Sequence, residues 1–327
     1  MLISILALVT TAAGLGHPDG PVFAEQARAA CAAPVGDRPQ VEGVRVELLA
    51  PAPGDLPGLK VVDTATGGWM TVYHDPASEA AANARAACLG AQLALLAQAV
   101  GDQRRDARWA SVVFTTDPDY IPPRDGVDTR WTVATTQAGG LDEASRRKVV
   151  AVIPHEQVHD FQKRAGAETP RWFHEGHAEW VGRRVTAVID PEMGERLADQ
   201  GSADLAASTT PVDLMRWGGI SVKPEAILRQ VSAADRERMT ADPTWSPPGP
   251  FTFGPDDMQS DESNMAARYQ AAWTVFDAME RAHGGVAVRD WVRDVTSAEG
   301  RVSADAIQET AKTALGEDIV GRLETLD

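Results

Sequence analysis

The segment VVAVIPHEQVHDFQ, from Val149 to Gln162, decides how the rest of the chain is interpreted, because it contains the sequence HEQVH. His155 and His159 are four residues apart, so on a helix they share one face and can both bind one metal ion. Glu156 lies one position round the helix, where its carboxylate can act as a general base on the water that the metal activates. Such a short pattern also arises by chance, so the surrounding sequence must decide whether it is a metal site.

A catalytic zinc ion takes three protein ligands and keeps a fourth position for water. The motif HExxHxxGxxH is absent, because Gln162 and Ala165 stand where glycine and histidine would be needed. The segment TPRWFHEGHAEW follows instead, with Glu175 sixteen residues after the second histidine. We expect Thr169 to cap a helix whose first residue is Pro170. Glu175 then lies one to two turns inside that helix and completes a site for one Zn²⁺ per chain.

These two segments resemble the gluzincin metallopeptidases, in which HExxH is followed at a distance by a helix with the pattern W-x-x-E-G-x-A-E. Trp172, Glu175, Gly176, Ala178 and Glu179 match that pattern residue by residue. The resemblance implies a zincin-like fold with Glu175 as the third ligand and with Gly176 and Ala178 placed where two helices approach closely. It also implies that Glu179 hydrogen-bonds a zinc-bound histidine.

Three residues around this pattern have competing interpretations. Asp160 is a rival of Glu179 for the contact with a histidine. His174 and His177 flank Glu175 without sharing its helical face. We expect surface or packing roles for them, with substrate or oxyanion contacts as the alternative.

The resemblance extends to Tyr269, within RYQAAWTVFDAMERAHGG, because gluzincins of the aminopeptidase and related bacterial branches carry a tyrosine near the start of a later helix. It implies that Tyr269 stabilises the oxyanion. The same tyrosine belongs to an apolar stripe with helical spacing, so a structural role in the core is the alternative.

Three features depart from the gluzincin pattern. Pro154 directly precedes the first histidine, where it removes a helical hydrogen bond and should kink or restart the helix. The GxMEN-type sequence that binds a free substrate amine in aminopeptidases is absent, since GGLDE at Gly139–Glu143 is mismatched and too close to HEQVH. The insertion Gly201–Ser263 has no counterpart, which leaves the specificity pocket undefined.

Strand patterns come before helix patterns along the chain. Strands are expected at Gly68–His74, Trp109–Thr115 and Arg130–Thr136, the last two separated by a turn-forming run at Asp117–Gly126. Arg130–Thr136 is also a candidate sheet edge on which an extended peptide could lie.

A long Ala-rich helix is expected after the first strand, with Asp75 as its cap, Pro76 as its first residue and a stop at Gly101. From Asp142 onward helices predominate, and residues 242–263 are predicted to be a loop. The expected helices are Asp142–Arg164, Thr169–Ile189, Ser263–His283 and two shorter ones near the C-terminus. This order predicts an α+β protein with a small N-terminal sheet lobe, residues 25–141, and a mostly helical lobe, residues 142–327.

The charge balance excludes some partners. Lys and Arg number 31 and Asp and Glu 47, giving a net charge of −16. That sign repels nucleic-acid phosphates and anionic membrane surfaces. No stretch after the N-terminal segment approaches the ~18 continuous apolar residues of a membrane helix, so we expect no stable membrane insertion.

Residues 1–24 are interpreted as a signal peptide, because Met1–Gly16 is apolar and uncharged. A basic n-region is missing, so an ordinary buried segment is the alternative. In a secreted or extracytoplasmic protein we expect the only two cysteines, Cys31 and Cys88, to form a disulfide. The alternative is that they are buried free thiols.

The resemblance implies a secreted zinc peptidase, an endopeptidase acting on peptides or proteins, with Glu156 as general base and zinc on His155, His159 and Glu175. The rival hypothesis is a catalytically silent zincin-fold protein with a binding or regulatory role. A third is autoinhibition by the N-terminal lobe as a removable pro-segment.

Overall fold

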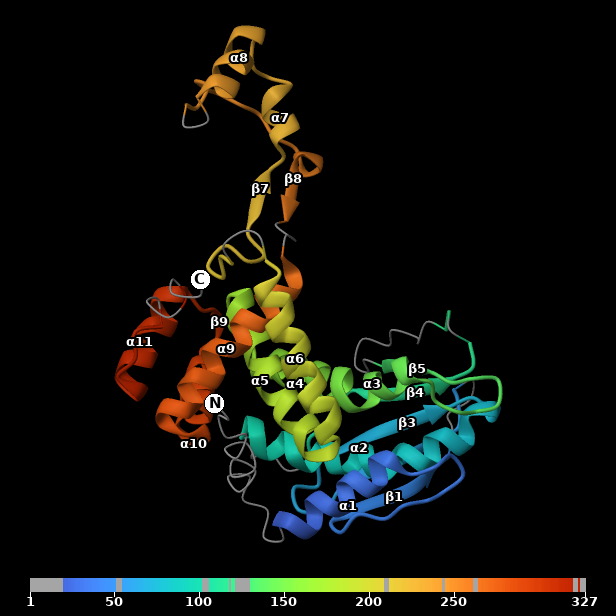
Figure 1. Ribbon diagram of the computed structural model, residues 1–327. Helices are drawn as coiled ribbons and strands as arrows, with labels where there is room; N and C mark the ends of the chain where they lie inside the picture. The colour runs from blue at the N-terminus through green and yellow to red at the C-terminus, as the bar shows by residue number, and fades with distance from the viewer. Residues whose placement is uncertain are drawn as a thin grey trace, which may run out of the picture.

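The computed structural model describes residues 20–50, 55–101, 106–117, 119–120, 130–208, 212–242, 245–260, 264–319 and 323. Most of the predicted signal peptide and of the run Asp117–Gly126 lies outside these residues. The proposed boundary at residue 24 falls inside helix α1 (Gly20–Ala32), whose Phe23 is buried. Figure 1 shows a sheet with helices on one side, a helical body beside it, and an arm that projects from that body.

One five-stranded sheet forms the N-terminal part, in the order β1-β2-β3-β4-β5. β1, β2 and β3 pair antiparallel, whereas β3, β4 and β5 pair parallel. The strands are β1 (Val44–Leu49), β2 (Gly58–Asp63), β3 (Trp69–His74), β4 (Ser111–Thr115) and β5 (Arg130–Ala134). The three predicted strands are therefore present, and β5 ends the row as the sequence suggested. β1 and β2 were not predicted.

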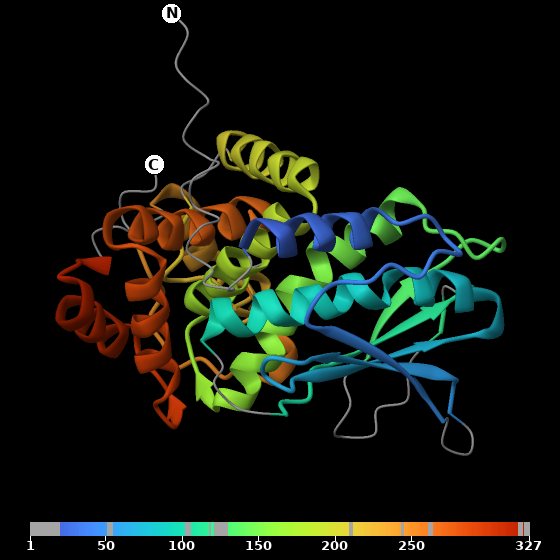
Figure 2. The ribbon, with the colours of Figure 1, turned by 90° about the horizontal axis from the view of Figure 1, so that it is seen from below.

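Helix α2 (Glu79–Val100) lies between this sheet and α1 (Figure 2). It ends as predicted at Gly101, which adopts the left-handed conformation. By length and composition α2 could cross a membrane, but nearly all of its side chains are buried in the protein. A Cβ at Gly90 would lie 2.2 Å from Cγ1 of Val44, so glycine is needed where the helix meets the sheet. The apolar character of α2 is therefore that of a core helix.

Asp75 connects the start of this helical segment to the sheet. Its side chain accepts hydrogen bonds from the backbone N–H of Ser78, in the 3-10 turn Pro76–Ser78 that precedes α2, and from Thr115 and Thr116 at the end of β4. The α-helix itself therefore begins at Glu79, three residues later than predicted. Burial alone would raise the pKa of Asp75, but these hydrogen bonds outweigh it and lower the pKa to about 2. The predicted cap therefore also fixes the neighbouring strand.

We expect Asp75→Ala to lower the free energy of unfolding by about 1–3 kcal/mol near neutral pH, because it removes a cap and leaves donors unpaired. The pKa of Asp75 is lower in the folded protein than the ~3.9 of an unfolded chain, so this stabilisation is present above that value and is lost as the pH falls through about 2. Urea unfolding of both proteins at neutral and acidic pH measures the difference. A difference that grows as the pH falls would contradict this role.

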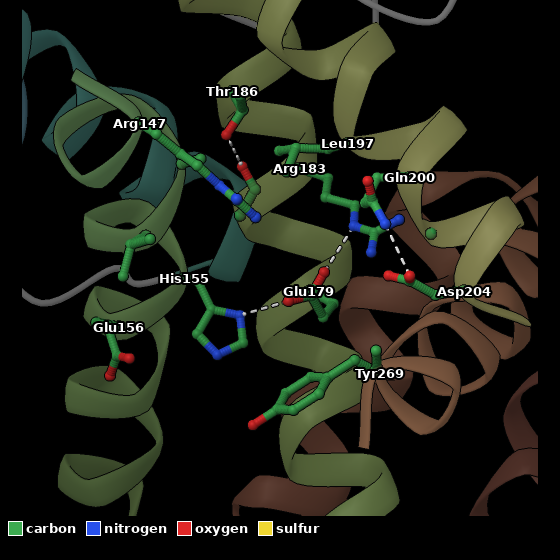
Figure 3. A pocket seen from close by; sticks show the side chains of 15 residues that line it. Arg147, His155, Glu156, Glu179, Arg183, Thr186, Leu197, Gln200, Asp204 and Tyr269 are labelled. Carbon is green, nitrogen blue, oxygen red and sulfur yellow. Dashed lines mark hydrogen bonds and ion pairs between the residues drawn. The ribbon is translucent and has the colours of Figure 1, made fainter. Parts of the chain in front are cut away.

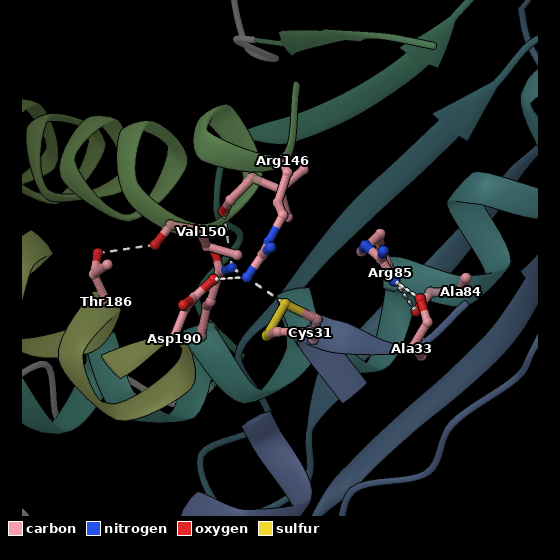
Figure 4. The surroundings of a disulfide bond; sticks show 11 residues. Cys31, Ala33, Ala84, Arg85, Arg146, Val150, Thr186 and Asp190 are labelled. Carbon is pink, nitrogen blue, oxygen red and sulfur yellow. Dashed lines mark hydrogen bonds and ion pairs between the residues drawn. A yellow bond between two sulfur atoms is a disulfide. The ribbon is translucent and has the colours of Figure 1, made fainter. Parts of the chain in front are cut away.

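The predicted disulfide is present. Cys31 in α1 is bonded to Cys88 in α2, 57 residues further along the chain, and both are buried (Figure 4). The bond fastens α1 to the central helix. Its surroundings include the ion pair between Arg146 and Asp190, whose side-chain atoms lie 2.7 Å apart.

Replacing both Cys31 and Cys88 with alanine is expected to reduce the free energy of unfolding by about 3–4 kcal/mol, because a bond across a loop of this length restricts the unfolded chain. Urea titration of the variant and of the oxidised protein gives the difference. Intact-mass analysis with and without reductant is the control. Two free thiols in protein recovered from the growth medium would show that the disulfide does not form and would contradict this prediction.

The helical part begins with α3 (Glu143–Arg147), a π-helical segment (Lys148–Val152) and α4 (Ile153–Ala165). Asp142 caps α3 through the backbone N–H of Ser145. Pro154 is the second residue of α4, so the proline lies in the first turn of a new α-helix, in agreement with the predicted restart.

Helix α5 (Arg171–Ile189) starts one residue later than predicted. Pro170 occupies the position before it, and no side chain caps this helix, so the prediction that Thr169 is the cap was wrong.

The remaining helices of this part are α6 (Pro191–Ala206), α9 (Met265–His283), α10 (Gly285–Thr296) and α11 (Ala304–Leu315), while β6 (Ala167–Glu168) pairs with β9 (Gly300–Arg301). The predicted α+β class, with a small N-terminal sheet and a mostly helical remainder, is confirmed.

The first residues of the insertion Gly201–Ser263, up to Ala206, belong to α6, whereas residues 220–242 and 245–260 form the projecting arm (Figure 1). Two short strands, β7 (Ile220–Val222) and β8 (Met258–Ser260), pair antiparallel and carry α7 (Pro224–Leu228) and α8 (Ala233–Ala241). Residues 242–263 are therefore not only a loop, because β8 and a 3-10 turn at Pro255–Asp257 lie within them. The many Pro, Gly and acidic residues of this segment predict a loop, and β8 forms only because it pairs with β7.

Candidate metal centre

Helices α4 and α5 pack against each other and carry the predicted ligands. The close approach occurs at Gly182, where a Cβ would lie 3.1 Å from the Cα of His155. Gly176 faces α9 instead, and a Cβ there would lie 2.8 Å from the ring of Phe276. The sequence identified Gly176 as a small contact residue but missed Gly182, which brings the backbone of α5 up to the first histidine.

Three donor atoms converge between the two helices. Nε2 of His159 lies 3.0 Å from Nε2 of His155 and 3.1 Å from Oε2 of Glu175, and His155 Nε2 lies 3.5 Å from the same carboxylate oxygen. Zinc bonds of about 2.0–2.1 Å in a tetrahedron place neighbouring ligand atoms about 3.3–3.4 Å apart. The spacing therefore fits two imidazoles and one carboxylate around a single zinc ion.

The outer nitrogens of the two histidines also have partners. His155 Nδ1 lies 3.1 Å from Oε1 of Glu179, and His159 Nδ1 lies 2.7 Å from Oε1 of Gln162. Because these oxygens are acceptors, each Nδ1 carries a hydrogen that faces them, and each Nε2 is the nitrogen left to bind a metal once any proton on it is released. Glu179 is itself held by Arg183, whose Nε lies 2.6 Å from Oε2.

Asp160 does not pair with a ligand histidine, the role in which it was a rival of Glu179. Its carboxylate pairs with Arg164, one turn further along α4. The acid facing a ligand histidine is Glu179, and the second histidine uses Gln162. In the sequence Gln162 stands out only as a mismatch to a longer zinc motif, although its position three residues after His159 places both on one helical face.

The charges of the site favour a bound cation. Burial alone would lower the pKa of His155, but the carboxylates of Glu175 and Glu179 outweigh it and raise the pKa to about 9. Burial would raise the pKa of Glu175, yet hydrogen bonds from His155 and His159 hold it well below its usual range. Glu175 is thus ionised at neutral pH, and a metal ion would replace a proton at His155.

A cavity of about 310 Å³ opens beside His155, and both Glu156 and Tyr269 line it (Figure 3). Glu156 is half-buried and forms no ion pair or hydrogen bond with the residues that the structure describes, so its carboxylate is available to a water molecule. The rest of the lining comes mainly from α5 and α6, with a contribution from α3 and the π-helical segment, and includes Arg147, Arg183, Leu197, Gln200 and Asp204.

Tyr269 reaches this cavity from α9, which is 94 residues beyond Glu175 in sequence. Its ring centre lies 6.1 Å from that of His155, and Figure 3 shows its hydroxyl directed toward the space beside that histidine. Burial and the charge of Glu175 raise the pKa of Tyr269 to about 12, so the phenol keeps its hydrogen at neutral pH. The ring is half-buried, unlike fully buried stripe residues such as Phe276.

The two remaining histidines of α5 occupy different surroundings. His174 stacks on His159 with ring centres 4.3 Å apart, and burial together with the neighbouring His159 lowers its pKa to about 4. His177 is 1% exposed and packs against Phe276, and burial lowers its pKa to about 3. Both rings are neutral at neutral pH, and the enclosure of His177 matches a packing role.

No family model and no curated protein matches the sequence. Among solved structures, the chain is similar to a mutant M1 zinc metallopeptidase from Deinococcus radiodurans, with 11% identity and a TM-score of 0.41. It is similar, with 14% identity and the same TM-score, to that mutant bound to a Tyr-Ser-Ala substrate. The matches cover 86% of this chain and 52% and 51% of those chains, so this chain spans about half their length.

Proposed function

We propose that this protein is a zinc-dependent peptidase with zinc on His155, His159 and Glu175. The single observation that carries the proposal is the convergence of these three donors, 3.0–3.5 Å apart, beside a cavity lined by Glu156 and Tyr269. A metal-binding role alone would account for the donors. It would not account for an available carboxylate and a protonated phenol on the same cavity.

Each residue has a distinct chemical task. When bound, zinc would polarise the scissile carbonyl and acidify a water molecule. The Glu156 carboxylate accepts a proton from that water and later delivers it to the leaving amine. The Tyr269 hydroxyl donates a hydrogen bond to the carbonyl oxygen as negative charge develops on it.

The substrate is proposed to be an extended peptide and the cleavage internal. The edge strand β5 is a place where a peptide backbone could pair. The buried disulfide supports a secreted or extracytoplasmic location, since such bonds persist in oxidising compartments.

A peptide-library digest tests the proposal. Mass spectrometry should detect new internal cleavages with the zinc-loaded protein, none after chelation, and recovery when zinc is restored. Glu156→Gln protein from a parallel purification controls for contaminating proteases. Zinc-loaded, folded protein that cleaves nothing would instead identify a catalytically silent binding or regulatory protein.

A further inference from the structure

The base of the insertion contributes a tryptophan to the candidate active site. Trp217 is only 4% exposed, and its ring meets that of Tyr269 edge-on, with centres 5.0 Å apart. The guanidinium of Arg171 lies 5.2 Å from the centre of the same indole. Trp217 therefore contacts both the proposed oxyanion donor and a cation at the start of α5.

Arg171 contacts the metal centre on two sides. Its Nε lies 3.8 Å from Oε1 of Glu175, the oxygen that does not face the histidines, and its guanidinium is hydrogen-bonded to Tyr269. Gly218, with φ of +76°, turns the chain against this side chain, and a Cβ there would lie 3.0 Å from Cδ of Arg171. The insertion thus holds Arg171 between a proposed ligand and the phenol.

The direction of the Arg171–Tyr269 hydrogen bond follows from chemistry. A guanidinium has N–H donors and no acceptor, so the phenol oxygen must accept. The phenol hydrogen is then free to point elsewhere. A cation on the oxygen side also makes the O–H a stronger donor, because it stabilises negative charge that shifts onto that oxygen.

We propose that Arg171, held in place by Trp217, is a positioning residue that orients the Tyr269 hydroxyl hydrogen toward the substrate oxygen. The inference rests on the proposed peptidase function and extends it to the insertion. Arg171 and Trp217 do not touch the reacting atoms, and both act through Tyr269. The arm is consequently joined to the catalytic apparatus at its base.

A double-mutant cycle tests this coupling. Arg171→Met should lower kcat about 10- to 100-fold with KM and zinc content nearly unchanged, whereas Arg171→Lys, which keeps a charged donor, should retain more activity. In the Tyr269→Phe background, Arg171→Met should change kcat by no more than about 2-fold. An equal loss in both backgrounds, or loss of zinc from Arg171→Met, would overturn the inference.

The arm offers a matched control for Trp217. Trp217→Leu should reproduce part of the kcat loss and show the same dependence on Tyr269. Trp245→Leu removes a tryptophan of the same insertion that packs on Arg238, 4.6 Å from its ring centre, and should leave kcat unchanged. Equal losses from both tryptophan variants would assign the effect to the arm as a whole and overturn the inference.

Binding of a peptide phosphonate, whose tetrahedral oxygens resemble the charged carbonyl oxygen in the transition state, separates this inference from the proposed function. Arg171→Met and Tyr269→Phe should weaken its binding non-additively. A wild-type protein that cleaves peptides and binds the phosphonate, with additive losses in the variants, contradicts the role of Arg171 alone. A wild-type protein that does neither overturns the peptidase function and this inference together.

Discussion

Glu156→Gln is expected to lower the turnover number by about 10³- to 10⁴-fold while the protein keeps one zinc ion per chain. Glutamine has nearly the same shape as glutamate but cannot accept the proton. The structure places Glu156 outside the ligand set and without a described partner, so its replacement should disturb neither the metal nor the fold. Steady-state kinetics on one cleaved peptide and metal analysis of the same sample measure both quantities.

Glu195→Gln is the matched control, because Glu195 is an exposed glutamate on α6. It should match the wild-type protein in turnover and zinc content. If zinc content of Glu156→Gln collapses and activity falls only in proportion, Glu156 has a structural role and its assignment as general base is wrong.

Tyr269→Phe is expected to cut the turnover number about 10²-fold or more and to lower the free energy of unfolding by no more than ~1 kcal/mol, because Arg171 loses its acceptor. The carbonyl oxygen gains charge in the transition state, and one metal ion stabilises that charge only in part. A positioned phenol strengthens that contact in the transition state more than in the ground state. Kinetics and urea unfolding of the same variant test both halves of this expectation.

A purely structural tyrosine would behave differently. Loss of its hydroxyl would cost a similar ~1 kcal/mol of stability, because Arg171 again loses its acceptor, but the turnover number would be kept. That result would assign Tyr269 to the apolar stripe of α9. The oxyanion donor would then have to be sought among His174, His177 or the insertion.

Local patterns made the ligand-bearing helices predictable. Two histidines four residues apart share one face when the segment is helical, and Glu175 belongs to a pattern confined to one helix. The Asp75–Pro76 signal also predicted the start of the central helical segment. The same signal recurs at Asp190 and Pro191, where Asp190 caps α6 through the backbone N–H of Met193, and it could have revealed that helix.

Features that depend on distant contacts could not be predicted in the same way. β2 follows a Pro-rich stretch and is buried at nearly every position, so it has no alternating pattern, whereas the alternation Val-Arg-Val-Glu-Leu in β1 could have revealed that strand. Trp217 acquires its role only because the insertion folds back onto α5 and α9. No spacing within residues 201–263 indicates that this segment returns to those helices. The contact of Gln162 with His159, in contrast, could have been predicted, because residues three apart share one helical face.

Zinc K-edge X-ray absorption on protein loaded with one equivalent of zinc tests the central claim most directly. Two imidazole nitrogens and oxygen ligands are expected at about 2.0–2.1 Å, from His155, His159, Glu175 and water. In Glu175→Ala protein the two imidazoles should remain and the zinc should be held more weakly. A loaded, folded wild-type protein whose zinc shows fewer than two imidazoles would contradict the proposed metal centre.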